Sequence, residues 1–282
     1  MAFSLSAILP KAMRRNGKIV PVIRLSGTIG AASPLRGGLT LAGLEAALAR
    51  AFSYKAAPAV ALLINSPGGA AVQSHQIFQR IRALAQEKEK RVIVAVEDVA
   101  ASGGYMIALA GDEIVVDPSS IVGSIGVVSA GFGFHELIGK IGIERRVHTA
   151  GEKKVILDPF RPEREEDVAR LEALQHDVHA LFIDLVRTRR GAALSDDPDL
   201  FSGAFWSGSR AVALGLADRV GDLRSVLKER YGKDVRLKLI ATERSMWRRR
   251  LGLPSRAGRA GEGVEAAIAA VEDRLLWSRF GL

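Results

Sequence analysis

The chain has 282 residues, of which 48% are hydrophobic and 25% are charged, proportions that are typical of a globular protein. It contains no cysteine, which excludes disulfides, thiolate catalysis and cysteine-ligated zinc. The formal net charge is +9, and part of it comes from a cluster of arginines near the C-terminus: Arg244, Arg248, Arg249, Arg250, Arg256 and Arg259. The excess of positive charge therefore reflects the C-terminal tail more than the core.

The N-terminal segment does not resemble a secretory signal. Its positive charges follow a short apolar patch, whereas a signal has the opposite order and a longer apolar segment. No apolar run approaches the roughly 20 residues that a membrane-spanning helix needs. We expect residues 1–17 to form a leader that is neither a cleaved signal nor an anchor, in a protein that is cytoplasmic or membrane-associated.

Hydrophobic periodicity predicts alternating strands and helices in the first part of the chain. We expect strands at 18–25, 59–64, 91–96 and 113–116, and helices at 41–52, 70–86 and 105–110. The run 59–64 is apolar throughout, as in a parallel strand that is buried on both faces, and Val72 is expected on the apolar stripe of the helix that follows. This alternation favours a layered α/β fold.

In the second part of the chain, we expect strands at 125–128, 144–148 and 235–240, and helices at 135–141, 162–190, 207–216 and 264–280. The pattern is mostly helical after residue 160. The helix at 162–190 carries an apolar stripe along its length, and the last helix carries Trp277.

The stretch Ala101-Ser102-Gly103-Gly104-Tyr105 lies between an apolar strand and an apolar helix. It puts the Ser102 hydroxyl at a strand-to-helix turn, near the partial positive charge of a helix N-terminus. Such a position suits a nucleophile that must develop negative charge, although a serine there also serves simply as a helix cap. A hydroxyl is a weak nucleophile until a neighbouring base accepts its proton.

The candidate bases are histidines and lysines. None of the histidines has an obvious carboxylate partner, and His75, His176 and His179 are expected on solvated helix faces. Lys154 precedes three apolar residues and a Pro-Phe corner, and burial in such surroundings lowers the pKa of a lysine enough for it to accept a proton. Lys153 would point to solvent in an extended segment. Two surface lysines in a loop are the alternative.

An oxyanion hole needs backbone N–H groups with no side-chain bulk in front of them. Gly68 and Gly69 follow a buried strand in the sequence Asn65-Ser66-Pro67-Gly68-Gly69, and Gly103 follows the candidate nucleophile. These three glycines are candidate donors. Taken alone, Pro-Gly-Gly is equally well explained as a tight turn.

Four motifs together resemble the signal peptide peptidase family of the SppA/SohB type. They are, in the order and spacing of the family, Ile64–Gly69, Ala101–Tyr105, Val122–Val127, and Lys154 followed by Pro159-Phe160. The resemblance implies a crotonase- or Clp-protease-like α/β spiral fold and a serine endopeptidase without cofactor or metal. It also implies Ser102 as nucleophile, Lys154 as general base, Ser124 as the residue that orients the lysine amine, and the Pro-Gly-Gly turn as part of the oxyanion hole.

The resemblance further implies assembly and a substrate class. Family members with one copy of the motif set form homo-oligomeric rings in which the serine and the lysine of one site come from neighbouring protomers, so a monomer would be inactive. Their substrates are remnant signal peptides and other apolar unfolded segments, for which the loop 127–134 would line pockets. The peptidase domain would be 18–240, followed by a basic linker and amphipathic helix at 241–282.

Family members usually carry an N-terminal membrane span, and none is visible in this sequence. The arginine cluster and the helix of Trp277 are candidates for a peripheral membrane contact, with a solvated tail and a packing helix as the alternative. No nucleic-acid partner is expected, because the basic residues are not interleaved with aromatic residues over a long stretch.

Two other functions stay open on the sequence alone. An acyl-CoA hydratase or isomerase has the same type of fold but needs carboxylates at its site, and Glu97 and Asp98 are the nearby candidates. A non-catalytic scaffold would keep the fold and bind peptides. The intact set of Ser102, Ser124 and Lys154 argues against the scaffold.

Overall fold

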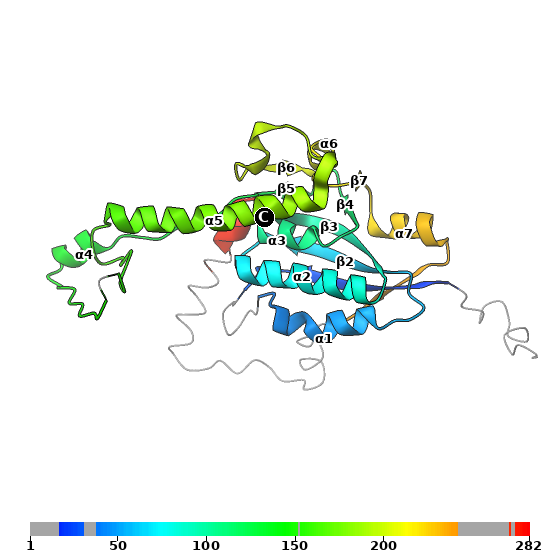
Figure 1. Cartoon of the computed structure of the whole chain (residues 1–282), viewed down its shortest axis with the longest axis horizontal. Coiled ribbons are helices and arrows are strands. Elements are labelled where there is room, and N and C mark those ends of the chain that lie inside the picture. The colour runs from blue at the N-terminus through cyan, green and yellow to red at the C-terminus, as the bar shows by residue number, and fades with distance from the viewer. Residues whose placement is uncertain (1–16, 31–37, 152, 242–270, 272–273) are drawn as a thin grey trace, which may run out of the picture.

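The computed structural model describes residues 17–30, 38–151, 153–241, 271 and 274–282 (Figure 1). A mostly parallel sheet forms its centre, with strands in the order β6-β5-β3-β2-β1-β8, while β4 pairs with β3 and β7 pairs with β4. The strands are β1 Ile19–Ser26, β2 Ala59–Ser66, β3 Arg91–Ala101, β4 Glu113–Val116, β5 Ile121–Gly123, β6 Phe205–Ser207, β7 Arg219–Val220 and β8 Arg236–Leu239. The α-helices are α1 Leu41–Phe52, α2 Ala71–Glu87, α3 Gly103–Ala108, α4 His135–Lys140, α5 Glu165–Arg190, α6 Gly208–Ala213 and α7 Leu223–Tyr231.

Strand β3 has two different neighbours along one of its sides. Its first half pairs with β4, from Ile93 opposite Glu113, and its second half pairs with β5, from Val99 opposite Ile121. Strand β2 pairs along the other side of β3. The carboxyl ends of these parallel strands meet at one edge of the sheet, which is where ligands bind in open α/β sheets. Ser102 follows β3 directly and therefore lies at that edge.

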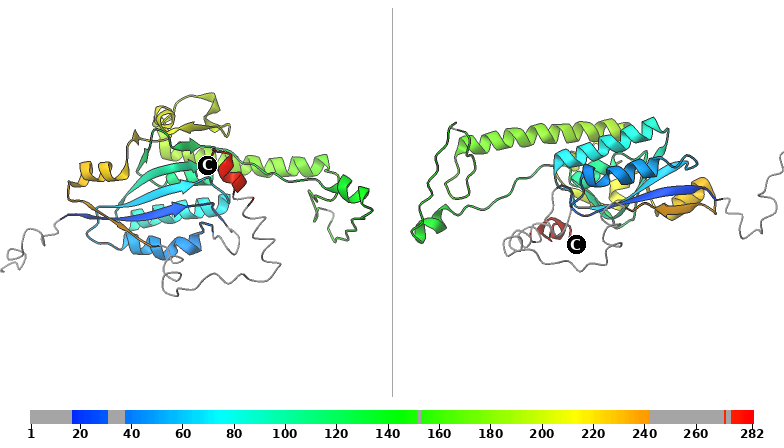
Figure 2. Two further views of the ribbon diagram at one scale, coloured as in Figure 1. Left: turned by 180° about the vertical axis from the view of Figure 1, so that it is seen from behind. Right: turned by 90° about the horizontal axis from the view of Figure 1, so that it is seen from below.

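The sheet is covered on both faces (Figure 2). Leu62 and Val94 belong to a core that they share with α1, α2 and α3, whereas Ala61 and Ile93 belong to a second core with α7 on the opposite face. Successive residues of a strand point to opposite faces, so a strand that is covered twice must be apolar at every position. This explains the continuous apolar run at 59–64.

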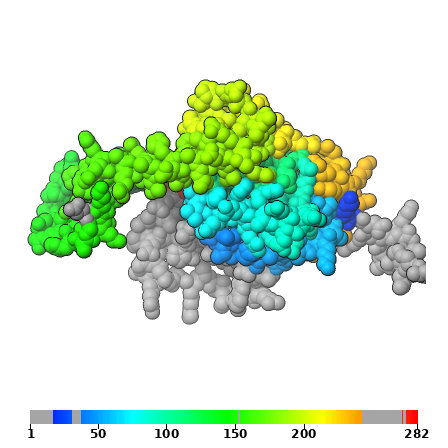
Figure 3. All heavy atoms as spheres, viewed as in Figure 1, coloured from blue at the N-terminus to red at the C-terminus, as the bar shows by residue number. Residues whose placement is uncertain are grey.

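Helix α5 extends from the body as an arm (Figures 1 and 3). Near its C-terminal end Phe182 and Val186 are buried against the body, but Leu174 and Leu181 are 59% and 46% exposed. The segment 127–164, which includes α4, runs out from the body to the far end of α5 (Figure 2). The apolar stripe predicted along the helix therefore meets a core over the last part of α5 only.

The end of the chain packs on the sheet beside the Ser102 turn. Residues 274–278 are helical, and Phe280 is buried in a small cluster with Val99 of β3. Trp277 packs against the same cluster, next to Ile121 of β5. Among the described residues, Trp277 thus belongs to a packing helix, one of the two alternatives that the sequence left open.

The predicted elements of the body are confirmed apart from shifts at their ends, but two predicted strands are wrong. Residues 125–128 form no strand, because Ser124 has a φ of 53° and turns the chain directly after β5. Residues 144–148 form no strand either, because they lie on the arm, away from the sheet.

Four of these elements, β5, β6, β7 and α7, were absent from the predictions. Helix α7 buries only Leu223, Val226 and Leu227, which is too short an apolar pattern to stand out among its charged residues. Val72 is 67% exposed and does not belong to the apolar stripe of α2. The leader up to residue 16 and the arginine cluster lie outside the described residues. No helix in the described ranges has the length and apolarity needed to cross a membrane.

Candidate active site

Ser102 occupies a sharp turn between β3 and α3. Its φ of 50° and ψ of −122° form a conformation that non-glycine residues rarely adopt, at a cost of about 1–3 kcal/mol. The N–H of Ser102 donates to the carbonyl of Gly123 at 2.8 Å, and its carbonyl accepts from the N–H of Met106 at 2.9 Å. Sheet pairing and the first turn of α3 thus hold the strained residue. Serine nucleophiles of α/β hydrolases sit on a strand-to-helix turn of this kind.

Glycine is required where the turn after β2 meets the turn of Ser102. A Cβ on Gly68, whose φ is +105°, would lie 2.8 Å from the Cβ of Ser102 and 2.9 Å from the nitrogen of Gly103. A Cβ on Gly103 would lie 2.3 Å from Oγ of Ser74. Real Cβ atoms do not approach other atoms so closely, so the two turns pack backbone against backbone.

The three candidate oxyanion donors differ in their hydrogen bonds. The N–H of Gly68 donates to Oγ of Ser66 at 3.2 Å. Within the described residues, the N–H groups of Gly69 and Gly103 donate to no protein oxygen. Both glycines line the cavity that contains Ser102. Unpaired N–H groups beside a nucleophile are suited to stabilise a developing oxyanion, which makes Gly69 and Gly103 the better-placed pair.

A polar network holds together the ends of β2 and β3 next to the turn of Ser102. Nδ2 of Asn65 donates to Oδ2 of Asp98 at 2.6 Å, and its Oδ1 accepts from the N–H of Val99 at 3.3 Å. Glu97 forms an ion pair of 2.9 Å with Arg24. Neither carboxylate lines the cavity. The two acidic residues closest to Ser102 in sequence therefore make structural contacts and do not face the cavity.

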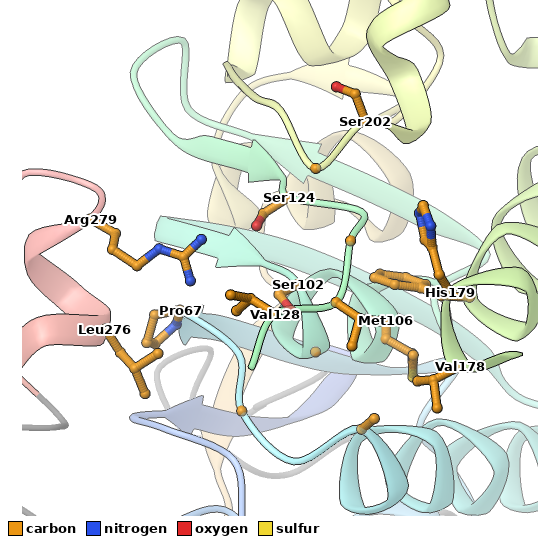
Figure 4. Close-up of a pocket in the computed structure, with 17 residues that line it drawn as sticks. Pro67, Ser102, Met106, Ser124, Val128, Val178, His179, Ser202, Leu276 and Arg279 are labelled. Carbon is orange, nitrogen blue, oxygen red and sulfur yellow. The ribbon is translucent and has the colours of Figure 1, made fainter. Parts of the chain in front are cut away.

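The cavity beside Ser102 has a volume of about 670 Å³, within the range of roughly 300–1,000 Å³ typical of ligand sites (Figure 4). Its walls are part apolar and part polar. Their apolar side chains come from α3, from the segment after β5, from α5 and from the C-terminal helix: Met106, Val127, Val128, Val178, Phe182 and Leu276. A partly apolar space of this size beside the Ser102 hydroxyl can hold a ligand that carries apolar groups.

Ser124 lines the same cavity and is 7% exposed. Its N–H donates to the carbonyl of Ala204 at 2.7 Å, and its φ of 53° sets it at the turn where the chain leaves β5. No hydrogen bond of its hydroxyl is found within the described residues, and Figure 4 shows the side chain above Ser102. The structure thus brings together Ser102, Ser124 and the glycine turns that the sequence predicted.

Lys154 does not line this cavity in the single chain. It is exposed, as is Lys153, and its segment lies between α4 and α5 on the arm (Figure 1). The N–H of Lys154 donates to the carbonyl of Gly151 at 3.1 Å, in a turn rather than the extended segment that was expected. Of the described residues that line the cavity, none is a lysine.

His179 contradicts the sequence expectation. It was expected on a solvated face of its helix, but it is half-buried and lines the cavity, with Nε2 3.0 Å from the carbonyl oxygen of Ile125. The reason is that α5 crosses the edge of the sheet here. The spacing of His179 with Phe182 and Val186, at three and seven residues, already placed it on the buried face of the helix.

Tyr105, the last residue of the serine motif, has a structural role. Its hydroxyl donates to the carbonyl of Leu216 at 2.8 Å, and complete burial raises the pKa of this phenol well above its usual value. It stays protonated and anchors α3. In the described ranges, no group of three or more His, Asp or Glu residues is arranged to hold a metal ion.

Comparison with known proteins identifies the family. The model of peptidase family S49 matches residues 84–236, and a model described as ClpP-like SDH-type serine proteinase matches residues 8–131. The chain belongs to peptidase family S49. The resemblance to SppA/SohB-type peptidases is therefore confirmed.

Two relatives and one solved structure define the extent of this likeness. The chain is 54% identical over 289 residues to the Na(+)/H(+) antiporter NhaA of Brucella abortus, covering 99% of this chain and 39% of that protein. It is 36% identical over 171 residues to the chloroplastic serine protease SPPA of Arabidopsis thaliana, covering 60% of this chain and 24% of that protein. The chain thus spans well under half the length of these relatives.

The solved structure is a lysine-to-alanine mutant of the 1510-N membrane-bound stomatin-specific protease in complex with a substrate peptide. Its TM-score is 0.50 at 16% identity, and the match covers 90% of this chain and 99% of that one. At this identity the likeness concerns the fold alone, and the predicted Clp-protease-like α/β fold is confirmed.

Proposed function

We propose that the protein is a serine endopeptidase in which Ser102 is the nucleophile and Lys154 of a neighbouring copy is the general base. The observation that carries this proposal is the strained turn of Ser102, which faces a cavity next to two backbone N–H groups that have no partner among the described residues. Membership of peptidase family S49 supports the same class of reaction.

The proposed reaction is an acyl transfer. Oγ of Ser102 attacks the peptide carbonyl carbon while its proton passes to the amine of Lys154. The carbonyl oxygen becomes an oxyanion, and the N–H groups of Gly69 and Gly103 stabilise it. The C–N bond then breaks, and the leaving amine takes the proton from the lysine. Water hydrolyses the resulting ester by the same steps and releases Ser102.

The arm supports a base that comes from another copy. Helix α5 has 26 residues, so it is about 40 Å long at the usual rise of ~1.5 Å per residue. The segment that carries Lys154 lies at its far end, where Phe132, Leu137 and Ile141 are 76%, 55% and 62% exposed. Apolar side chains gathered on a projecting arm are typical of a contact with another protein. We propose that this contact is with a second copy, in a closed homo-oligomeric ring.

Ser124 has a role in this arrangement. A lysine amine that enters the cavity needs an acceptor to orient it, and the hydroxyl of Ser124, a residue that lines the cavity, has no hydrogen bond within the described residues. We propose that this hydroxyl accepts a hydrogen bond from the amine of Lys154. The apolar part of the cavity wall suits apolar unfolded segments as substrates, remnant signal peptides among them.

The structure does not favour the alternative of an acyl-CoA hydratase or isomerase, because the candidate carboxylates are not at the site. That chemistry needs carboxylates at the reacting centre, and Glu97 and Asp98 both lie outside the cavity in contacts with Arg24 and Asn65. No observation favours a non-catalytic scaffold over a peptidase.

The direct test is cleavage of an internally quenched apolar peptide by purified wild type and three variants. Ser102→Ala and Lys154→Ala are expected to lose at least about 100-fold in rate, the usual scale for a catalytic acid or base. Lys153→Ala is the matched control, because this lysine is also exposed and is next in sequence. Wild-type rates in Ser102→Ala would overturn the proposal.

A further inference from the structure

The C-terminal segment 274–282 forms one wall of the cavity that contains Ser102. Leu276 and Arg279 both line it. The segment is held by buried contacts: Phe280 is 8% exposed, and its ring meets the ring of Phe205 edge-on at a centroid distance of 5.1 Å. The end of the chain is therefore a built part of the site and supplies residues that the family motifs do not include.

Arg279 gives this cavity its charge. Of the described residues that line it, Arg279 alone carries a permanent charge, and none is an aspartate or glutamate. Figure 4 shows the side chain extending from the C-terminal helix toward Ser124 and Ser102. Its positive charge thus has no counter-ion among those cavity residues, and the side chain is exposed, so a ligand can reach it.

The chemistry of the cavity indicates what it binds. Apart from Arg279, the walls combine apolar side chains with serine hydroxyls, so a ligand can place apolar groups against the apolar part and a charged group at Arg279. A guanidinium is a rigid planar fork that matches a carboxylate in a bidentate manner. An apolar peptide with one carboxylate therefore fits better than a neutral or basic peptide.

We propose that Arg279 is a specificity-determining residue that binds a carboxylate of the peptide beside the scissile bond. This inference rests on the proposed peptidase function. The carboxylate has two possible sources: the free C-terminus of a short peptide, such as a cleaved fragment, or an acidic side chain within a longer one. Both present the same chemistry to the guanidinium, so the experiment must separate them.

The test measures binding of fluorescent peptides to the 282-residue Ser102→Ala chain, which keeps Arg279 but lacks the nucleophile. The peptides share one apolar sequence. One has glutamine at the variable position and a C-terminal amide, one has glutamine and a free C-terminus, and one has glutamate and the amide. At least one carboxylate peptide is expected to bind about tenfold more tightly than the neutral one, equivalent to ~1.4 kcal/mol.

Two further substitutions in this background assign the preference. Arg279→Gln is expected to abolish it while the neutral peptide binds as before. Arg274→Gln is the matched control, because Arg274 lies on the same helix, is exposed and does not line the cavity, and it should leave the preference intact. Arg279→Lys keeps the charge and should keep part of the preference, which a purely structural role for Arg279 would not predict.

Equal binding of the three peptides, no binding of any, or a preference that survives Arg279→Gln would overturn the inference. Cleavage is measured separately with Ser102 intact. An Arg279-dependent preference in binding without any cleavage would leave the carboxylate site standing and overturn the peptidase. Cleavage that requires Ser102 but is equal for all three peptides would support the peptidase and overturn the carboxylate site.

Discussion

Asn65 donates a hydrogen bond of 2.6 Å from Nδ2 to Oδ2 of Asp98, and this bond ties the end of β2 to β3 just before the nucleophile. Asn65 is 8% exposed and also accepts from the backbone N–H of Val99. The Asn65 side chain thus connects the glycine turn after β2 to β3, the strand that Ser102 follows.

Asn65→Ala is expected to destabilise the fold by about 1–3 kcal/mol, because it leaves the buried N–H of Val99 without a partner. Denaturant unfolding at a fixed protein concentration measures this change. Asp98→Asn is the milder variant, since Asp98 is exposed and an amide oxygen still accepts from Asn65. An Asn65→Ala protein as stable as wild type would show that the bond does not hold the turn.

Gly68→Ala is expected to lower peptide cleavage by about 100-fold or more, because the added Cβ collides with Ser102 and moves the nucleophile away from its oxyanion donors. The matched control is Gly27→Ala. Gly27 has a φ of +110°, close to the +105° of Gly68, but no described atom lies within 4 Å of the position of its Cβ. Both variants carry a backbone cost of about 1–3 kcal/mol, so a difference in activity between them isolates the close approach to Ser102.

His179→Ala is expected to reduce kcat/KM about tenfold, the effect of losing one hydrogen bond that positions the segment of Ile125. His176→Ala on the same helix is the control, because His176 is exposed. His179→Gln should recover part of the activity, since its amide can donate to the same carbonyl. Steady-state kinetics decide the matter, and equal losses in the His176 and His179 variants would contradict a positioning role.

Phe132→Asp is expected to prevent assembly, because it puts a charge among the exposed apolar side chains of the arm, which we propose contact a second copy. Analytical ultracentrifugation should then find a monomer, and peptide cleavage should fall with assembly. Leu239→Asp is the control: Leu239 is 65% exposed, but it lies on the body in β8. An assembled and active Phe132→Asp protein would exclude the arm as the contact.

The local parts of the site were predictable from the sequence, and the long-range parts were not. The turn of Ser102 and the Pro-Gly-Gly turn each follow a strand that contains an apolar run, so a short window of sequence contains the whole signal. Phe280 packs against Val99, although the two residues are far apart in the chain, and no hydrophobic periodicity in the sequence predicts this contact. The same contact brings Arg279 to the cavity.

Lys154 illustrates a different limit. Its apolar neighbours left open a buried amine or a surface lysine in a loop, and in one chain the lysine is exposed on the arm. The burial that we propose for it depends on assembly, which a local sequence pattern does not report. His179 was within reach of the sequence, because its spacing to Phe182 and Val186 is that of one helix face.

The central claim is that Ser102 and Lys154 of one working site belong to different copies. The most direct measurement mixes Ser102→Ala and Lys154→Ala proteins, each inactive alone, under conditions in which subunit exchange is verified by mass spectrometry of labelled chains. Random exchange of equal amounts gives an intact pair at about one quarter of the contacts in a symmetric ring, so peptide cleavage should recover to about that fraction of wild type. Cleavage that stays at zero after complete exchange would contradict the claim and assign each site to a single chain.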